Sequence, residues 1–235
     1  MVWLAGVVGW CFSACLSSTK GVFGELYGEF LRECGSHLRE SGESMKKSVG
    51  VYGRIFPNPV LVVGTYTANG EPNAATIAWG GIASSGPASV SIAVRPSRCT
   101  FEALQRTGAF TINLATVEYA AAVDYFGITS GFDTHKFDTT GLTPVRGDFV
   151  DAPYIKEFPY NMECHVTNVV NLGEHSLFIG QVMDVKVDES ILDDDGSPNW
   201  ELARILSFDS SLKVYRAPGE IVGDAYSIGH KYIYM

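Results

Sequence analysis

The chain has 235 residues, of which 46% are hydrophobic and 18% are charged, so it can bury a substantial core, and disorder over its whole length is excluded. Its formal net charge of -9 disfavours a nucleic-acid partner, because phosphates would be repelled. Its 25 glycines and its short runs of Val, Ile, Tyr and Phe are typical of many strands joined by tight turns.

The beginning of the chain differs from the rest. Residues 1–16 are apolar, but they are shorter than a membrane span requires and have no basic residue ahead of the apolar run, unlike a signal peptide. Met45 opens a segment that looks like an ordinary cytosolic start. We favour a start assigned too far upstream; a lipoprotein or export signal at Cys15 and a genuine amphipathic extension remain alternatives. We therefore predict an N-terminal extension over residues 1–44 and one domain over residues 45–235.

Cysteine and histidine spacing does not indicate a metal site. The five cysteines include no CxxC pair, and the five histidines are isolated from one another. The acidic stretch at residues 193–196 lacks the flanking ligands of a calcium loop. We expect no bound metal, free thiols and a cytoplasmic location, with membrane contact only if the N-terminal segment is a true lipoprotein signal.

Elements can be assigned in chain order from residue 60. An Asn-Gly pair suits the turn between the first two strands, since tight turns need positive φ angles. The expected elements up to residue 126 are strands at residues 60–66, 73–79 and 88–94, a helix at 100–106, a strand at 109–114 and an Ala-rich helix at 117–126.

The second half of the chain is dominated by two long strands. Residues 127–152 are rich in Gly, Asp and Thr and predict an irregular connection. The long strands follow at residues 160–172 and 175–187, joined by a turn at residues 173–174; shorter strands are predicted at residues 212–215 and near the C-terminus. Antiparallel strands with two short inserted helices predict a mainly β fold, a closed or partly closed barrel. A Rossmann sheet is disfavoured because strands and helices do not alternate.

Four stretches carry a resemblance to a known family. They are residues 57–65, residues 73–79, residues 94–100 with 110–113, and residues 173–182. In this order and spacing they resemble the flavin reductase-like family of FMN-binding split barrels, especially its flavoredoxin branch, over about residues 50–235. The resemblance implies an antiparallel Greek-key split β-barrel that binds FMN and pairs as a homodimer, with each flavin close to the interface.

Physical chemistry suggests where an FMN phosphate could bind. Arg95 and Arg98 flank a Pro-Ser pair just before the helix that starts near Thr100. A helix start offers unpaired N–H donors and a positive dipole end, arginine grips phosphate with two hydrogen bonds, and Ser97 and Thr100 add hydroxyl groups. The alternative is a capped helix with two solvated arginines.

The flavin ring needs backbone hydrogen bonds and a flat wall. In the family, the strand that matches residues 73–79 runs beside the flavin, which implies contacts from Thr76, Ala78 and Trp79; a plain core strand is the alternative. Asn113 lies in an apolar strand and needs hydrogen-bond partners, so it has either a structural role or a flavin contact.

Three further side chains are candidates. Lys136 belongs to a Lys-Phe pair that the family often has, and it could reach the phosphate or the pyrimidine edge of the ring, or lie in solvent. His175 matches a family position at the dimer interface or on the side of the reducing substrate, unless its role is structural. His230 lies in a segment that resembles the family's terminal Gly-x-x-Tyr, which is expected to close over the flavin. We assign no catalytic side chain beyond these two possible histidines, because the flavin is the redox centre.

Three functions remain open. We favour an FMN-bound electron carrier of the flavoredoxin kind. The alternative is an NAD(P)H-dependent flavin reductase that supplies reduced flavin, and the second alternative is a small-ligand barrel without redox chemistry. The expected partners are a second copy and either a redox protein or NAD(P)H. The chain has no βαβ dinucleotide unit, so a nicotinamide would have to stack on the flavin, and the acidic net charge favours a protein partner.

Overall fold

A computed structural model describes residues 46–233 of the chain. Residues 46–52 contain no helix or strand, and all the elements below belong to the folded unit that begins at residue 53. The predicted extension over residues 1–44 lies outside the described residues, so the predicted domain boundary stays a prediction.

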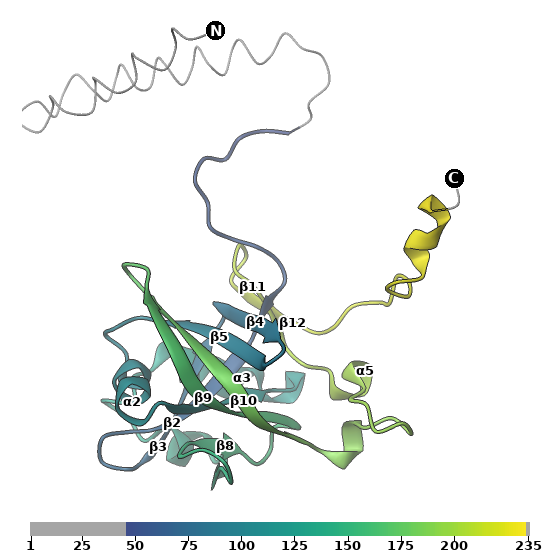
Figure 1. The fold of residues 1–235 in the computed structure, drawn as a ribbon. Coiled ribbons are helices and arrows are strands. Elements are labelled where there is room, and N and C mark those ends of the chain that lie inside the picture. Colours follow the sequence, from purple (N-terminus) through teal and green to yellow (C-terminus); the bar gives the residue numbers. More distant parts are fainter. Residues whose placement is uncertain (1–45, 234–235) are drawn as a thin grey trace, which may run out of the picture. The chain divides into compact units, whose positions relative to one another are not determined.

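Seven antiparallel strands form the main sheet, in the order β3-β2-β6-β9-β10-β5-β4 (Figure 1). Their bounds are β2 (Leu61–Tyr66), β3 (Pro72–Ile77), β4 (Gly80–Ser85), β5 (Ala88–Val94), β6 (Ala109–Leu114), β9 (Tyr160–Asn171) and β10 (Ser176–Val187). The connection from β5 to β6 carries α2 (Cys99–Thr107) and returns the chain to pair with β2, which gives the Greek-key order.

The two edges of this sheet are joined by the chain itself. β3 and β4 are the edge strands, yet only Ala78 and Trp79 separate them in sequence. The backbone N–H of Ala93 in β5 donates to the carbonyl of Trp79 at 2.8 Å, which holds this link against the far side of the sheet. We call the link at Ala78 and Trp79 the seam. The curled sheet is the split barrel that the sequence predicts, and the mainly β fold class is confirmed.

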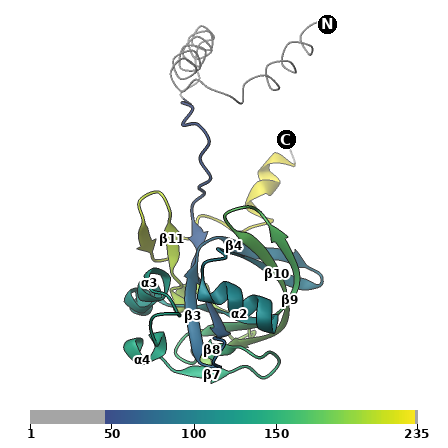
Figure 2. The same cartoon turned by 90° about the vertical axis from the view of Figure 1, so that its left-hand side faces the viewer.

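Apolar residues fill both faces of β2. Leu61 and Val63 pack inside the barrel, whereas Val60 and Val62 belong to a second cluster. This second cluster includes side chains of α3 (Ala120–Ile128) and α4 (Lys136–Thr140), which pack beside β3 (Figure 2). Because successive strand residues point to opposite faces, burial of both faces explains the continuous apolar run. Each buried aliphatic side chain stabilises the fold by about 1.5–3 kcal/mol.

A close backbone approach explains the glycine in β2. A Cβ atom on Gly64 would lie 2.0 Å from the carbonyl oxygen of Pro153 and 2.5 Å from the Thr111 hydroxyl. Pro153 begins β8 (Pro153–Ile155), which pairs with β7 (Pro144–Arg146). Only glycine therefore lets this small two-stranded sheet lie against the barrel.

A buried carboxylate fixes the loop between β7 and β8. Glu163 of β9 is 0% exposed and accepts hydrogen bonds from the backbone N–H groups of Asp148 (3.1 Å), Phe149 (2.7 Å) and Val150 (3.1 Å). The ammonium of Lys186 lies 2.5 Å from the same carboxylate. Burial alone would raise the pKa of Glu163, but the hydrogen bonds from Lys186 and the loop hold that pKa below its ordinary value.

The remaining elements are short. They are β1 (Asn58–Pro59), β11 (Ser207–Asp209), β12 (Val214–Arg216), α5 (Trp200–Ala203) and the 3-10 helices η1 (Val117–Tyr119), η2 (Glu189–Ile191) and η3 (Ile228–Tyr232). The described residues include no helix with the length and apolarity needed to cross a membrane.

Four sequence predictions of local structure were incomplete or wrong. β4 was not predicted, because its large apolar residue, Ile82, is exposed and leaves no alternating pattern. β1, β8, β11 and α5 were also missed, since each has only two to four residues. The connection over residues 127–152 contains α4 and β7 and is not wholly irregular. The strand predicted near the C-terminus is wrong, because the chain forms the 3-10 helix η3 there. The apolar side chains of this segment are exposed.

Candidate functional site

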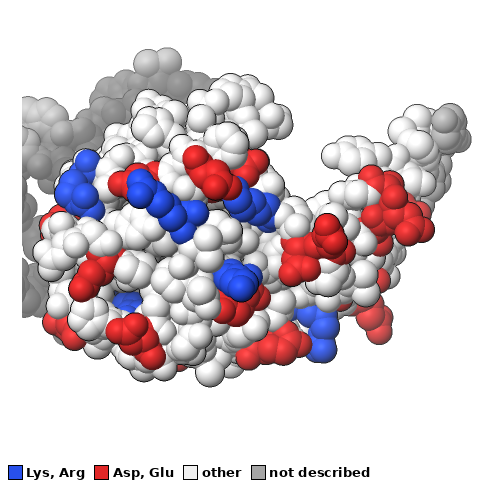
Figure 3. Space-filling model, turned by 90° about the horizontal axis from the view of Figure 1, so that it is seen from below, with Lys and Arg blue, Asp and Glu red and all other residues white. Residues whose placement is uncertain are grey.

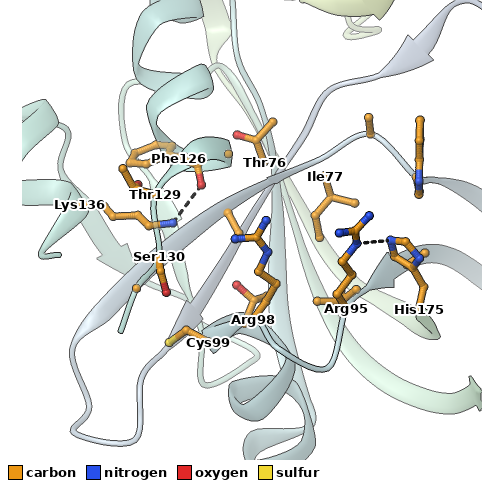
Figure 4. A pocket seen from close by; sticks show the side chains of 18 of the residues that line it. Thr76, Ile77, Arg95, Arg98, Cys99, Phe126, Thr129, Ser130, Lys136 and His175 are labelled. Atoms are coloured by element: carbon orange, nitrogen blue, oxygen red, sulfur yellow. Dashed lines mark hydrogen bonds between the residues drawn. The ribbon is translucent and has the colours of Figure 1, made fainter. Parts of the chain in front are cut away.

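A cavity opens where the seam meets the start of α2 and the loop after α3 (Figure 4). β3 and the seam contribute Thr76, Ala78 and Trp79, all of which the sequence assigned to the flavin. Thr76 is held by its hydroxyl, which donates to the Val123 carbonyl at 2.6 Å. Trp79 is 40% exposed at the rim, so the structure places a flat aromatic side chain beside the backbone of β3.

Five further predicted residues line the same cavity. Arg95, Arg98 and Thr100 come from the connection between β5 and β6, Lys136 from the start of α4 and His175 from the residue before β10. Residues far apart in sequence therefore converge on one opening, and three of them are cationic side chains.

The start of α2 is suited to an anion. Arg98 is the N-cap residue and provides no side-chain cap, and the first helical bond runs from Phe101 N–H to the Arg98 carbonyl at 2.9 Å. The backbone N–H groups of Cys99 and Thr100 precede this bond and have no acceptor within the helix. Together with the helix dipole and the Arg98 guanidinium, they make this end of the cavity electropositive.

The two arginines are not equivalent. Arg95 pairs with Glu174 at 2.8 Å, and its Nε donates to His175 Nε2 at 3.4 Å (Figure 4). Both partners come from the turn between β9 and β10, so part of the charge of Arg95 is already offset. No described residue forms an ion pair with Arg98, which leaves its guanidinium as the stronger anion ligand at this site.

Lys136 is the most buried of the three cations. Its side chain is 2% exposed, and Nζ donates to the carbonyls of Ala74 (2.7 Å) and Phe126 (2.9 Å). Burial lowers its pKa to about 8; negative charge on the Cys99 sulfur, when that thiol is ionised, would raise it, and the charge of Arg98 lowers it. Burial also raises the pKa of the Cys99 thiol, so that group stays protonated and neutral near pH 7.

The sequence did not single out an unpaired amide beside the cavity. Asn73 in β3 is buried, and its Nδ2 donates to the hydroxyls of Thr65 (3.4 Å) and Thr100 (3.3 Å). Its Oδ1 has no hydrogen-bond partner and lies beside Gly131, where a Cβ atom would be within 2.2 Å of it. Gly131 lines the cavity, whereas Asn73 itself is not among the lining residues. The sequence signal that could have pointed to Asn73 is an amide side chain at the start of a strand made mostly of small residues.

Three predicted residues are not among those that line the cavity. Asn113 is buried inside the barrel wall, where Nδ2 donates to the Val62 carbonyl (2.9 Å) and Oδ1 accepts from Asn161 (2.8 Å). This is the structural role considered above. Ser97 is exposed in the turn before α2, and His230 lies in the exposed helix η3.

Phe208 is a lining residue that sequence reasoning could not find. It comes from β11, a strand too short to be predicted. Cys99 and Cys164 are free thiols in the structure, while the other cysteines lie outside the described residues. Among residues 46–233, no group of three or more metal-ligating side chains comes together.

Comparison with known proteins gives consistent results. The model of the flavin reductase like domain matches residues 52–201. The flavoredoxin of Desulfovibrio vulgaris (Miyazaki F) is 41% identical, with a TM-score of 0.75 over 79% of this chain and 100% of that one. The flavoredoxin from Methanosarcina acetivorans is 25% identical, with a TM-score of 0.74 over 81% of this chain and 100% of that one. A protein of Archaeoglobus fulgidus, whose function is uncharacterised, is 30% identical over 60% of this chain and 80% of its own length.

The split barrel and these relatives define a flavin-associated redox protein. The chain belongs to the flavin reductase-like family, and within that family to the flavoredoxin branch.

Proposed function

We propose that the chain binds FMN in the cavity at the seam and works as an electron carrier. The observation that carries this proposal is the convergence of Arg98, the N–H groups at the start of α2 and Lys136 on a cavity that β3 and the aromatic ring of Trp79 also line. A ligand with a phosphate at one end and an aromatic ring at the other fits this distribution of charge.

The two ends of the cavity suit the two ends of FMN. Arg98 and the start of α2 would hold the phosphate, with Arg95 contributing less because Glu174 already pairs with it.

The wall of β3 suits the flat ring. Ala75 and Ala78 leave its backbone accessible, and Trp79 borders the opening. Bound flavin would supply the electron-transfer chemistry. The protein would position the ring, exclude water from one face and stabilise negative charge through Lys136.

NAD(P)H-dependent flavin reduction is the second candidate, because the cavity opens at the exposed Trp79, where a nicotinamide could reach the ring. The described residues contain no βαβ dinucleotide unit, so a nicotinamide would have only this surface. The net charge of -9 favours a neutral or basic redox protein as donor. Acidic and basic side chains are interspersed on the face seen in Figure 3, without one continuous basic surface there. That pattern gives no support to a nucleic-acid partner.

Anaerobic stopped-flow reduction tests this order of candidates. We expect slow reduction of bound FMN by submillimolar NADH and NADPH, and fast exchange with a reduced redox protein. Rapid reduction by either nucleotide would establish the reductase instead. Purified protein that has no flavin absorbance and takes up no added FMN would point to a barrel for another small ligand.

A homodimer is also proposed, on the apolar surface beside the cavity. Val170 at the exposed end of β9 pairs with Leu177 of β10, and Leu177 pairs with Ala93, which lines the cavity. Leu172, two residues after Val170 in the same hairpin, is also exposed and extends this apolar strip. A second copy related by twofold symmetry would bury the strip, as such pairs commonly do.

Light scattering should give twice the chain mass at micromolar concentration. Val170→Glu should shift the protein toward the monomer. Leu202 of α5 is also an exposed apolar residue, so Leu202→Glu serves as the control and should leave the mass unchanged. A monomeric mass for the unaltered protein would refute the dimer.

We place the protein in the cytoplasm, where its two described thiols would stay reduced.

A further inference from the structure

We propose that Lys136 couples occupation of the cavity to the uptake of one proton, so that the affinity for an electron-rich or anionic ligand group falls when Lys136 is deprotonated. The identity of the ligand, FMN, rests on the function proposed above. The coupling itself rests on the surroundings of Lys136 alone.

The position of the ammonium group carries the argument. Two of its three N–H bonds are directed to the carbonyls of Ala74 in β3 and Phe126 in α3. The third remains for the cavity that Lys136 lines, and Figure 4 shows the ammonium directed toward this opening. A ligand atom there would complete the hydrogen bonding of Lys136.

The charges around Lys136 disfavour its protonated form while the cavity holds no anion. The side chain is 2% exposed, and among residues 46–233 no carboxylate forms an ion pair with it. A buried charge without a counter-charge is costly. The charged or titratable groups that face it are Arg98, which repels it, and the Cys99 thiol of α2. The neighbouring His135, the N-cap residue of α4, directs its Nδ1 to the carboxylate of Glu71 at 3.1 Å and not to Lys136.

The balance of protons follows from these contacts. With its pKa lowered to about 8, Lys136 is a neutral amine in about nine tenths of the molecules at pH 9 and in about one tenth at pH 7. A ligand oxygen that accepts from Nζ, or carries negative charge near it, stabilises the ammonium. The lone pair of Nζ then takes a proton from solvent as the ligand enters, and no electron moves. By linkage, loss of that proton must weaken ligand binding by the same free energy.

Calorimetry in two buffers of different ionisation enthalpy measures the coupling directly. We expect uptake of close to zero protons per FMN at pH 7 and about 0.9 at pH 9, with an affinity about tenfold weaker at pH 9. The second ionisation of the phosphate, near pH 6, lies outside this window. Proton uptake measured with riboflavin and with inorganic phosphate, compared with that for FMN, shows whether the ring or the phosphate is the group that contacts Lys136.

Variants separate Lys136 from other titrating groups. Lys136→Arg keeps a permanent charge, so its FMN affinity should be flat between pH 7 and pH 9 and its proton uptake close to zero. Lys136→Met should also show no uptake, with weak binding at both pH values. Lys156→Met, which alters an exposed lysine that does not line the cavity, should behave as the unaltered protein does. If Lys136→Met does not fold, nitrogen NMR of lysine side chains in the ligand-free protein still reports the titration of Nζ.

Two failures can be told apart. FMN binding with equal affinity at pH 7 and pH 9 and without proton uptake would overturn the role of Lys136 and leave the proposed function intact. A protein that binds no flavin at pH 7 would overturn the proposed function. The coupling would then be decided by inorganic phosphate: proton uptake at pH 9 together with titration of Nζ near pH 8 supports it, and absence of either refutes it.

Discussion

Replacing Glu163 with alanine should lower the free energy of unfolding by about 3–5 kcal/mol, because it leaves buried donors without an acceptor. Three backbone N–H groups of the loop between β7 and β8 donate to this carboxylate, and Val150 among them is buried. Lys186 loses one partner but keeps Asp184 at 2.7 Å. The loss should therefore arise mainly from the loop, and urea unfolding measures it.

A matched control lies in the same loop. Asp151 pairs with Arg146 at 3.1 Å, but both side chains are largely exposed, so Asp151→Ala should cost less than about 1 kcal/mol. Equal effects of the two substitutions would show that the buried carboxylate does not hold the loop.

The charge of Glu163 predicts a pH dependence with a definite sign. Because its pKa is depressed in the folded state, its stabilising contribution is present above the ordinary value of 4.5 and is lost as the pH falls through the lower folded value. Glu163→Gln cannot change its charge, so it should flatten the loss of stability below about pH 5. A variant whose acid unfolding matches that of the unaltered protein would contradict this.

Replacing Arg98 with alanine should weaken FMN binding about tenfold or more, since it removes at least one charge-assisted hydrogen bond of about 1.5–3 kcal/mol. Arg98 stands at the open start of α2 and has no ion-pair partner among the described residues. Fluorescence titration of FMN at pH 7, where Lys136 is charged, isolates this contact from the proton coupling.

Comparison with Arg95 makes the test sharper. Arg95 already pairs with Glu174, so Arg95→Ala should weaken binding less than Arg98→Ala does. Arg146→Ala, which alters an exposed side chain at the end of β7, should leave FMN affinity unchanged. Unchanged affinity in Arg98→Ala would mean that the phosphate binds elsewhere.

The elements that sequence predicts well are those whose own residues determine them. The long strands β9 and β10 and the helix α2 lie within a few residues of their expected bounds. β4 could not be predicted in this way, because Gly80–Ser85 is a strand through its pairing with β5 and through the seam that delivers the chain to that edge. Its pairing is a property of the barrel and not of its side-chain pattern.

The site shows the same division. Arg98 and Thr100 could be assigned because a helix start next to cationic residues has a local meaning. The burial of Lys136 and the unpaired oxygen of Asn73 depend on how α3, α4 and β3 pack together, which no spacing along the chain encodes.

The seam has a consequence for how the barrel opens. The cavity is lined by the seam and β3 on one side and by Ala93 of β5 on the other, and the Ala93–Trp79 hydrogen bond lies between them. Any local opening of the barrel that parts these strands must also dismantle the cavity. A ligand that binds only the closed arrangement therefore adds its binding free energy to the cost of opening. The bound ligand would therefore hold the two edges of the barrel together. Amide hydrogens of β3, β4 and β5 would then exchange with solvent more slowly as the occupancy of the cavity rises.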